Sequence, residues 1–283
     1  MEKRSHKMSC LYIIPTPIGN LKDITLRALD ALNEVDVILA EDTRTTNHLL
    51  KHFEITTKTK AYHQHNEHLL TAKVIQEIFK SEKGYAIVSD AGTPGISDPG
   101  YLLIRECIKN NIKIISLPGP TAFVPALTQS GFPCDRFLFE GFLPHKKGRK
   151  KKLEILKEEK RTVILYESPH RILKLLKELN DYIGPDRLVS VSRELTKVYE
   201  ETLIGTANEL VEKFSKQKPK GEFVVVIDAL KTNQWKLKPF KELILETSKQ
   251  PVLKQKEKIS SFFEEWRRGY EQVDDVCIIS IRV

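Results

Sequence analysis

Short apolar runs rich in β-branched residues recur along the first 230 positions of the chain. A first set of these runs occupies residues 10–14, 36–40, 85–89 and 112–116. A second set occupies residues 136–140, 162–166, 188–192 and 222–228. The stretches between them carry apolar residues at the spacing of amphipathic helices. Strands that alternate with helices predict an α/β fold with a mostly parallel sheet.

Five of the intervening stretches show a clear helical pattern. Their approximate bounds are 23–35, 67–79, 149–159, 170–182 and 206–214. In the first of them Leu26, Leu29 and Leu32 fall on one helical face. Asp23 precedes this face and is predicted to be the N-cap residue.

A Pro- and Gly-rich segment at 117–135 separates the two sets of predicted strands. We therefore expect an N-terminal α/β domain over residues 10–120 and a second α/β domain over residues 121–230. A cleft between two such domains is a favoured place for a ligand. The remainder, residues 231–283, is lysine-rich and less regular, and we expect an appendage with short helices.

The composition is that of an ordinary globular protein, with 283 residues, 40% hydrophobic and 30% charged. The longest apolar runs reach about seven residues, whereas a membrane-spanning helix needs about 20. Pro15 interrupts the apolar run after the basic N-terminus, so no secretory signal is expected there. We expect a cytoplasmic protein that makes no membrane contact, and its natural start is either Met1 or Met8.

The cysteine and histidine pattern does not indicate a metal site. The four cysteines lack the paired spacing of metal ligands, and no His-Glu-x-x-His motif is present. They are Cys10, Cys107, Cys134 and Cys277. We expect reduced thiols in a reducing compartment and no bound metal.

The net charge of +8 and the isoelectric point near 9.1 suggest an anionic partner. Six of the eight residues at 145–152, "HKKGRKKK", are Lys or Arg. This segment is either a solvated helix start or a surface that contacts nucleic-acid phosphates. The second interpretation makes RNA-binding candidates of Lys146, Lys147, Arg149, Lys150, Lys151 and Lys152.

Two common nucleotide-binding motifs, G-x-G-x-x-G and G-x-x-x-x-G-K-[ST], are absent. Instead, loops rich in Gly and Pro follow the predicted strands, at 15–25, 89–100 and 116–122. Glycine lets the backbone approach a ligand closely, and proline constrains the turn. Because ligands bind at the carboxyl ends of strands in open α/β sheets, these loops predict a ligand site lined by backbone.

A series of longer motifs runs in a fixed order through residues 10–228. The motifs are PTPIGNLKDIT, AEDTR, YHQHNE, SDAGTPGISDPG, LPGPTA, FEGFLP, YESPHR, SREL and GEFV. With them the chain resembles the bacterial 16S rRNA ribose 2′-O-methyltransferases, a branch of the tetrapyrrole methylase superfamily. The resemblance implies two α/β domains, a homodimer, and S-adenosyl-L-methionine as the methyl donor in the interdomain cleft. It also implies 2′-O-methylation of a cytidine ribose in the decoding region of 16S rRNA, within the small ribosomal subunit.

The same resemblance assigns the residues of the cofactor site, with the loop after the third strand as a main binding element. In the first domain they are Pro17, Gly19, Asp90, Ala91, Gly92, Thr93, Pro94, Pro118 and Gly119. In the second domain they are Glu167, Ser168 and Phe223.

A ribose hydroxyl is a weak acid, so a nearby base or cation would assist methyl transfer. Candidates within the motifs are Glu41, Asp42, Arg44, His65, Glu67, His170 and Arg171. Each has a structural alternative: Asp42 can cap a helix, His65 can be a surface or core histidine, and Arg171 can bind an RNA phosphate or pair with a neighbouring acid. No general base is assigned, because positioning alone can supply much of the rate.

Two other functions remain open. A tetrapyrrole (porphyrinogen) C-methyltransferase would share the fold and the donor, but the motif set and the basic segment argue against it. A non-catalytic ribosome-assembly or RNA-binding factor would also keep the fold. The intact "DAGTP" and "LPGP" loops argue against that alternative.

The end of the chain departs from the family pattern. The stretch "FFEEWRRGYEQVDDVCIISIRV" resembles the terminus of bacterial PP2C-type phosphatases, where an aspartate of a Q-x-D-D element binds metal. Asp274 and Asp275 occupy that place. The rest of a phosphatase is absent, so we expect no such activity, and a turn before an edge strand is the simpler interpretation.

Overall fold

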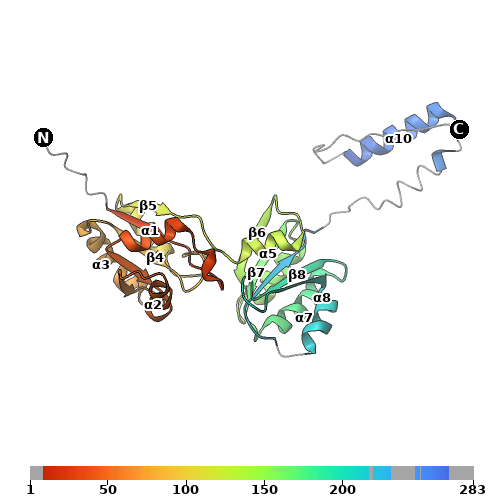
Figure 1. The fold of residues 1–283 in the computed structure, drawn as a ribbon. Helices are drawn as coiled ribbons and strands as arrows, with labels where there is room; N and C mark the ends of the chain where they lie inside the picture. The colour runs from red at the N-terminus through yellow and green to blue at the C-terminus, as the bar shows by residue number, and fades with distance from the viewer. Residues whose placement is uncertain (1–8, 217–218, 231–245, 249, 268–283) are drawn as a thin grey trace. The chain divides into compact units, whose positions relative to one another are not determined.

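The computed structural model describes residues 9–216, 219–230, 246–248 and 250–267 (Figure 1). The described residues up to Leu230 form one compact unit, and those beyond it form a second. Helix α10 (Val252–Arg267) is the long element of the second unit. The strands and helices α1 to α8 belong to the first unit. Asp274, Asp275 and Cys277 lie outside the described residues.

The first sheet is entirely parallel. Its strands are β1 (Cys10–Ile13), β2 (Val37–Ala40), β3 (Lys58–Ala61), β4 (Tyr85–Val88) and β5 (Lys113–Ser116), in the order β3-β2-β4-β1-β5. The connecting helices are α1 (Leu26–Glu34), α2 (Thr43–His52), α3 (Glu67–Lys80) and α4 (Tyr101–Lys109). Leu11 of β1 lies opposite Tyr85 on one side and Ile114 on the other. Because the strands are parallel, their carboxyl ends meet at one edge of the sheet.

Helices cover both faces of the first sheet. Val74 of α3 and Leu103 of α4 share a buried cluster with Leu11. Leu32 of α1 belongs to a second cluster, with Ile38 of β2. Burial on both faces explains why these strands appear in the sequence as continuous apolar runs.

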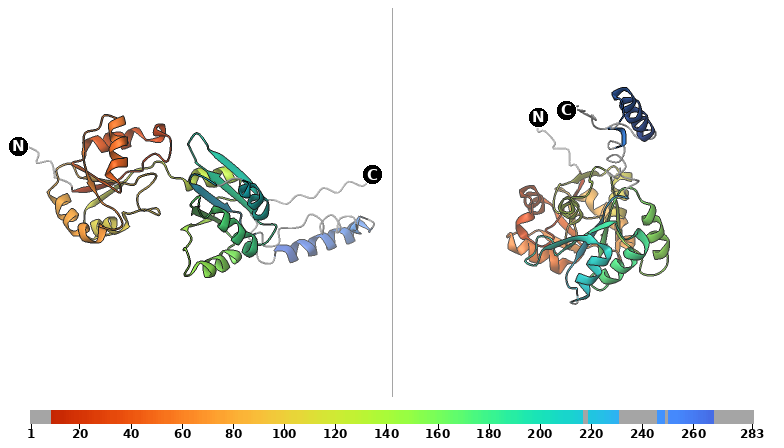
Figure 2. Two further views of the ribbon diagram at one scale, coloured as in Figure 1. Left: turned by 90° about the horizontal axis from the view of Figure 1, so that it is seen from below. Right: turned by 90° about the vertical axis from the view of Figure 1, so that its right-hand side faces the viewer.

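The second sheet is mixed. Its strands are β6 (Phe137–Phe142), β7 (Thr162–Glu167), β8 (Leu188–Arg193), β9 (Glu201–Thr206) and β10 (Phe223–Ile227), in the order β6-β7-β10-β8-β9. The helices are α5 (Phe123–Ser130), α6 (Arg149–Glu158), α7 (Ile172–Ile183) and α8 (Ala207–Ser215). Only the β6–β7 pair among these strands is parallel, so this sheet differs from the entirely parallel first sheet and from the mostly parallel pattern that the sequence predicts. Figure 2 shows both sheets from two further directions, the first in red to yellow and the second in green to blue.

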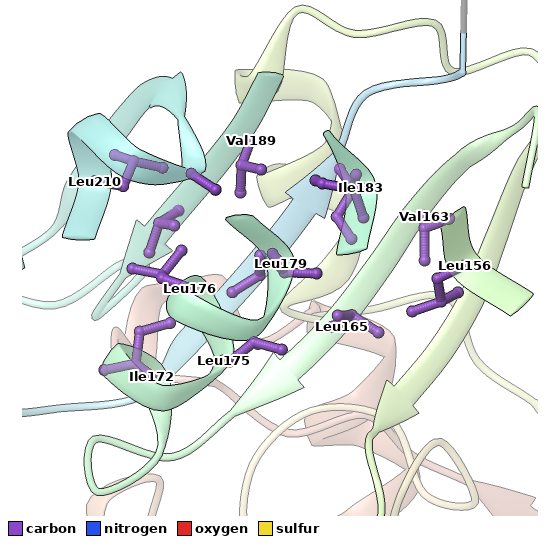
Figure 3. Packing of buried hydrophobic residues seen from close by; sticks show 14 of the residues in the cluster. Leu156, Val163, Leu165, Ile172, Leu175, Leu176, Leu179, Ile183, Val189 and Leu210 are labelled. Atoms are coloured by element: carbon purple, nitrogen blue, oxygen red, sulfur yellow. The ribbon is translucent and has the colours of Figure 1, made fainter. Parts of the chain in front are cut away.

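One face of the second sheet carries the largest buried cluster described. Figure 3 shows Leu175, Leu176 and Leu179 of α7 packed among side chains that include Leu165 and Val189 of the sheet. Helix α5 covers the opposite face with a smaller cluster. Burying a leucine of this kind contributes about 1.5 to 3 kcal/mol, so α7 is a main anchor of this half of the unit.

The predicted α/β class is confirmed, but strands β3 and β9 had no signal in the apolar pattern. Both lie at the edge of their sheets, and their residues are exposed or half-buried. An edge strand needs fewer apolar residues, because it has a neighbour on one side only. Since β3 precedes β4, the loop at 89–100 follows the fourth strand of the chain and not the third.

The predicted N-cap of the first helix is wrong. Asp23 ends a short 3₁₀ helix at Leu21–Asp23, and α1 begins only at Leu26. Thr25 is the N-cap residue, and its hydroxyl accepts a hydrogen bond from the Ala28 N–H at 3.1 Å. A threonine close behind the aspartate therefore takes the capping role, since it is the extended residue that directly precedes the first helical residue.

Three general properties follow from the described residues. None of their helices combines the length and apolarity that crossing a membrane requires. Cys10 and Cys107 are buried free thiols, and Cys134 is an exposed one. No group of three metal-ligating side chains occurs in the part of the chain that the structure describes.

Candidate functional site

A cavity of about 380 Å³ lies between loops of the two sheets. On the first sheet its walls follow the carboxyl ends of β1, β4 and β5, which are neighbours in the strand order. On the second sheet its walls come from the ends of β6, β7 and β8 and the start of β10. Its lining residues are Ile18, Ala91, Ile96, Ser97, Asp98, Ala122, Phe142, Tyr166, Glu167, Ser168, Pro169, Leu195, Glu222, Phe223 and Val224. A mostly apolar cavity at strand ends is the expected place for a small molecule, and we call it the first cavity.

The loop after β4 forms one wall of the first cavity and is held by hydrogen bonds. Gly92 and Thr16 form a β-bridge, with N–H to carbonyl distances of 2.9 Å in both directions. Gly92 has a φ of +86°, which residues with a Cβ rarely adopt. The Thr16 hydroxyl donates to the Ser89 carbonyl at 2.9 Å, and the Thr93 hydroxyl donates to the Pro120 carbonyl at 3.0 Å. These bonds tie the loops after β1, β4 and β5 into one rim.

The opposite wall, at the corner between β7 and α7, contains a buried ion pair. The Glu167 carboxylate is fully buried and accepts hydrogen bonds from Arg171 at 2.7 and 3.0 Å and from the Ser168 N–H at 2.9 Å. Arg149 lies 3.8 Å from the same carboxylate. Arg171 also donates to the Leu143 carbonyl at 3.2 Å. Glu167 therefore shapes the wall without offering a free charge, and Arg171 is an acid-bridging residue and not a free phosphate ligand.

Asp98 is the carboxylate that the first cavity leaves without a counterion. Burial raises the pKa of Asp98 to about 6, and the negative charges of Glu41, Asp90 and Glu222 add to this rise, while the Ser89 side chain opposes it. No Lys, Arg or His of the described residues lines the first cavity, and no cation is among the main influences on the pKa of Asp98. A partly buried carboxylate without a paired cation favours a cationic ligand beside it.

A second cavity, also of about 380 Å³, adjoins the first. The two share Ile18, Ala91 and Glu222. The other lining residues of the second cavity are Thr16, Pro17, Gly19, Leu21, Thr45, Thr46, His48, Leu49, Asp90 and Lys197. A side chain at position 19 would collide with Lys197 and Thr196, so the loop after β1 comes this close only because Gly19 has no Cβ.

The residues predicted to bind the cofactor fall into three groups. Ala91, Glu167, Ser168 and Phe223 line the first cavity, as the sequence predicts for a common site. Pro17, Gly19 and Asp90 line the second cavity, together with Ala91. The remaining ones line neither of these cavities and belong to the rim: Gly92, Thr93, Pro94, Pro118 and Gly119.

Several lining residues were missed by the sequence reasoning. They are Ile18, Ile96, Ser97, Asp98, Ala122, Phe142, Tyr166, Pro169, Leu195, Glu222 and Val224. Asp98 lies in the Gly- and Pro-rich loop at 89–100, so an acidic residue in that loop was the sequence signal that could have identified it. The apolar ones carry no local signal, because only the meeting of the two sheets brings them together.

Asp42 and Arg44 form a local structure at the start of α2. Asp42 is the N-cap residue, and its carboxylate accepts from the Arg44 N–H at 2.8 Å and from the Arg44 guanidinium at 2.6 Å. Hydrogen bonding by Arg44 lowers the pKa of Asp42 to about 2. The capping alternative for Asp42 is therefore observed, and neither residue lines the two cavities.

The other predicted catalytic residues also lie outside the cavity linings. His65 is exposed just before α3, Glu67 is the first residue of α3, and His170 is exposed between β7 and α7. Glu41 is half-buried at the end of β2, where burial and the charge of Asp90 raise its pKa. The structure therefore places none of these groups beside a ligand in the first cavity.

The basic segment at 145–152 is divided between surface and interior. Its exposed cations are Lys146, Lys147, Lys150 and Lys151. The Arg149 side chain is only 5% exposed and donates to Glu178 at 2.7 and 2.8 Å. Lys152 pairs with Glu140 at 2.5 Å. The prediction of a phosphate contact is wrong for Arg149, because a buried guanidinium already paired with a carboxylate cannot reach RNA.

Two α/β sheets with a ligand-sized cavity between their loops define a class of protein that holds a small molecule at its strand ends. A family model described as "Tetrapyrrole (Corrin/Porphyrin) Methylases" matches residues 10–211. The chain belongs to this family of methylases.

Curated relatives agree with this assignment. The chain is 48% identical over 221 residues to a Synechocystis protein, covering 78% of this chain and 79% of the relative. It is 50% identical to a Vibrio cholerae protein, covering 77% and 76%, and 46% identical to a Thermotoga maritima protein, covering 78% and 98%. All three are named "Ribosomal RNA small subunit methyltransferase I".

Solved structures share the fold at lower identity. A cobalt precorrin-4 methyltransferase matches with a TM-score of 0.58 and 18% identity, covering 78% of this chain and 95% of that one. A uroporphyrin-III-C-methyltransferase from Thermus thermophilus matches with a TM-score of 0.52 and 18% identity, covering 77% and 94%. These likenesses establish the two-sheet architecture.

Proposed function

We propose that the protein transfers a methyl group from S-adenosylmethionine to the 2′-hydroxyl of a cytidine ribose in the decoding region of 16S rRNA. The relatives named as ribosomal RNA methyltransferases share 46 to 50% of their residues with this chain over most of its length. The two tetrapyrrole methyltransferases of known structure share only 18% of their residues with it. This contrast favours an rRNA acceptor over a porphyrinogen.

The observation that carries the donor assignment is Asp98 in the first cavity. S-adenosylmethionine has a sulfonium and an ammonium against one carboxylate, so its net charge is positive. Asp98 is partly buried, lines an otherwise largely apolar cavity and has no cationic partner among the described residues. A carboxylate in that environment stabilises a bound cation more strongly than it would in water.

The chain contributes positioning and exclusion of water. The bound donor supplies an electrophilic methyl group for an in-line displacement, and the protein must hold it about 3 Å from the acceptor oxygen. Phe142, Tyr166 and Leu195 give the first cavity apolar walls that keep competing water away. The rim of backbone hydrogen bonds around Gly92 keeps the loop after β4 in place.

We assign no general base among Asp42, Arg44, His65, Glu67 and His170, because none lines either cavity. Asp42 in particular is held by Arg44, and its low pKa makes it a poor proton acceptor. Positioning of the donor and the acceptor is then the main contribution to the rate.

The substrate side of the proposal rests on the exposed part of the basic segment. Lys146, Lys147, Lys150 and Lys151 remain candidates for contacts with rRNA phosphates, whereas Arg149 and Arg171 are engaged inside the protein. Action on an assembled small ribosomal subunit would place the protein in the cytoplasm. The homodimer implied by the family resemblance is part of the same proposal.

The experiment is methyl transfer from labelled S-adenosylmethionine with small subunits that lack the modification, and with free rRNA and a porphyrinogen as parallel acceptors. We expect label on one cytidine ribose of the subunit, mapped by nuclease digestion and mass spectrometry. Asp98→Asn should lose donor affinity by about 100-fold or more in calorimetric titration, because a charge pair in a cavity is lost. The exposed carboxylate variant Asp135→Asn is the matched control and should bind the donor normally.

Each contrary result has a distinct meaning. Label on the porphyrinogen would mean that the acceptor is a tetrapyrrole and not rRNA, while the proposed donor site would stand. Unchanged donor affinity in Asp98→Asn would mean that the donor does not bind in the first cavity. No label on any acceptor, with the donor still bound, would favour the non-catalytic alternative.

A further inference from the structure

The second cavity is separate from the donor site yet shares a wall with it. Ile18, Ala91 and Glu222 belong to both linings, so a ligand in one cavity would touch the same residues as a ligand in the other. The second cavity has about the same volume as the first, which is within the range that holds a small organic ligand. Methyl transfer requires an acceptor beside the donor, and the second cavity is a space that adjoins the proposed donor site.

Thr46 gives independent evidence that the second cavity receives a polar ligand. It lies on α2, lines the cavity and is only 3% exposed. Its hydroxyl oxygen has no hydrogen-bond partner among the described residues. Leaving a buried hydroxyl without a hydrogen-bond partner costs about 1 to 3 kcal/mol of stability. Such a group is therefore expected where a ligand supplies the missing hydrogen bond.

The charged groups around the second cavity include both donors and acceptors of hydrogen bonds. Asp90 and Glu222 supply carboxylates, whereas His48 and Lys197 supply nitrogen donors. The Lys197 ammonium is positioned by Glu194 and Glu222, each at 2.9 Å. The Asp90 carboxylate accepts from the Asp42 N–H at 3.1 Å, which fixes it against the start of α2.

This mixture of charges indicates a neutral, polar ring rather than a phosphate. A phosphate site would present an excess of cations, but here two carboxylates face one lysine and one histidine. The edge of a nucleobase offers donors and acceptors side by side, and enzymes read an unstacked base through such groups. The phosphates flanking that nucleotide would remain outside, in solvent.

We propose that the second cavity binds the acceptor nucleoside of the RNA, unstacked from its neighbours, with its ribose at the wall shared with the donor cavity. This inference rests on the proposed function and assigns a place to its substrate. The Thr46 hydroxyl then forms a hydrogen bond with the nucleoside. Helix α2 contributes to the choice of nucleoside through Thr45, Thr46 and His48. Pro17, Gly19 and Asp90 contact the acceptor in this arrangement and not the donor.

The test is to fill the cavity from an exposed position. Thr45 is exposed on α2 and lines the cavity, so Thr45→Trp adds bulk there without disturbing the core. Lys51→Trp places the same side chain at another exposed position of the same helix, outside the cavity lining, and is the matched control. We expect Thr45→Trp to leave the donor dissociation constant within about twofold and to lower methylation of small subunits by about 100-fold or more, since misplacement of an acceptor by about 1 Å already costs that much. Lys51→Trp should match the unaltered protein in both measurements.

A second variant tests the hydroxyl itself. Thr46→Val keeps the shape of the side chain and removes only the oxygen. We expect about a tenfold loss of kcat/KM for the subunit, the effect of one hydrogen bond of about 1.4 kcal/mol, with no loss of thermal stability. Unchanged kcat/KM in Thr46→Val would remove Thr46 from the recognition of the substrate.

A binding measurement keeps the inference testable if no rRNA is methylated. Saturation-transfer NMR with cytidine 5′-monophosphate, in the presence of S-adenosylhomocysteine, reports nucleoside binding without catalysis. Loss of the signal in Thr45→Trp, with retention in Lys51→Trp, supports the site even if the proposed reaction fails. An equal signal in all three proteins, or loss of donor affinity in Thr45→Trp, would overturn the proposal, because the second cavity would then be unoccupied by nucleoside or part of the donor site.

Discussion

The two walls of the first cavity each carry a buried or half-buried carboxylate. The two carboxylates differ in whether a cation of the protein pairs with them. Glu167 at the corner of β7 and α7 is fully buried and held by Arg171, the Ser168 N–H and the nearby Arg149. Asp98 in the loop after β4 has no cationic partner among the described residues, and its pKa is raised to about 6. One wall therefore contains a paired carboxylate that stabilises the fold, and the other contains a carboxylate that a cationic ligand can pair with.

The largest expected effect comes from removing the paired carboxylate. Glu167→Ala leaves the half-buried Arg171 and the nearby buried Arg149 without this carboxylate and should lower the free energy of unfolding by about 3 to 5 kcal/mol. Urea denaturation followed by circular dichroism measures this loss. Glu154→Ala on the exposed face of α6 is the control and should change stability by less than about 0.5 kcal/mol. A small effect of Glu167→Ala would mean that the two walls do not differ as described.

Arg149 and Lys150 sharpen the comparison, because neighbouring cations of one basic segment have different environments. Arg149→Met leaves the Glu178 carboxylate without its hydrogen bonds and should cost about 1.5 to 3 kcal/mol of stability. Lys150→Met, on an exposed side chain, should cost almost nothing. Thermal unfolding of the two variants in parallel distinguishes them, and equal midpoints would contradict the buried pairing of Arg149.

In the ligand-free protein Asp98→Asn should raise the free energy of unfolding, whereas Glu167→Ala should lower it. The folded pKa of Asp98, about 6, lies above its ordinary value of 3.8, so its contribution to stability is present below about pH 4 and is lost as the pH rises through about 6. Asparagine resembles the protonated form, so the variant should gain about 1 to 2 kcal/mol at pH 7 to 8 and nothing at pH 4. Donor affinity of the unaltered protein should fall as the pH drops below about 6, because Asp98 loses its charge. Denaturant titrations and calorimetry across this pH range would show both trends, and a pH-independent stability difference would contradict the raised pKa.

A smaller effect on stability is expected from removing one of the hydroxyls that hold the loop after β4. Thr16→Val removes the hydrogen bond to the Ser89 carbonyl and should cost about 1 kcal/mol. The change should also weaken donor binding modestly, since the loop after β4 loses one of its ties. Hydrogen exchange at the Gly92 amide is the sensitive readout, and unaltered protection there would show that the backbone bridge alone maintains the rim.

The smallest expected effect on the protein itself belongs to the exposed lysines. Changing Lys146, Lys147, Lys150 and Lys151 to Gln should leave stability and donor affinity unchanged. It should weaken binding to small subunits and reduce the salt dependence, by about 0.7 to 0.9 in the log–log slope for each lost phosphate contact. An unchanged slope would mean that this segment is only a solvated face.

Local patterns of apolar residues in the sequence predicted much of the fold. Strands such as Tyr85–Val88 are buried on both faces, so their apolar runs are continuous and easy to recognise. The polar edge strand Lys58–Ala61 had no such pattern, because its place in the sheet depends on backbone pairing with β2. Thr25 replaced Asp23 as the helix cap because two capping residues lay close together and only the folded backbone selects between them.

For the site, the sequence by itself determined the loops, their glycines and the family. The motifs placed Gly92 where a positive φ is needed and identified Glu167 and Ser168 as neighbours of a common cavity. Only the tertiary structure decided which charges are free. Arg149 and Lys150 are adjacent cations of similar character in the sequence, yet one is buried against Glu178 and the other faces solvent. Whether a charged group is available to a ligand depends on burial and on partners distant in the chain, and these exist only once the helices have packed together on their sheet.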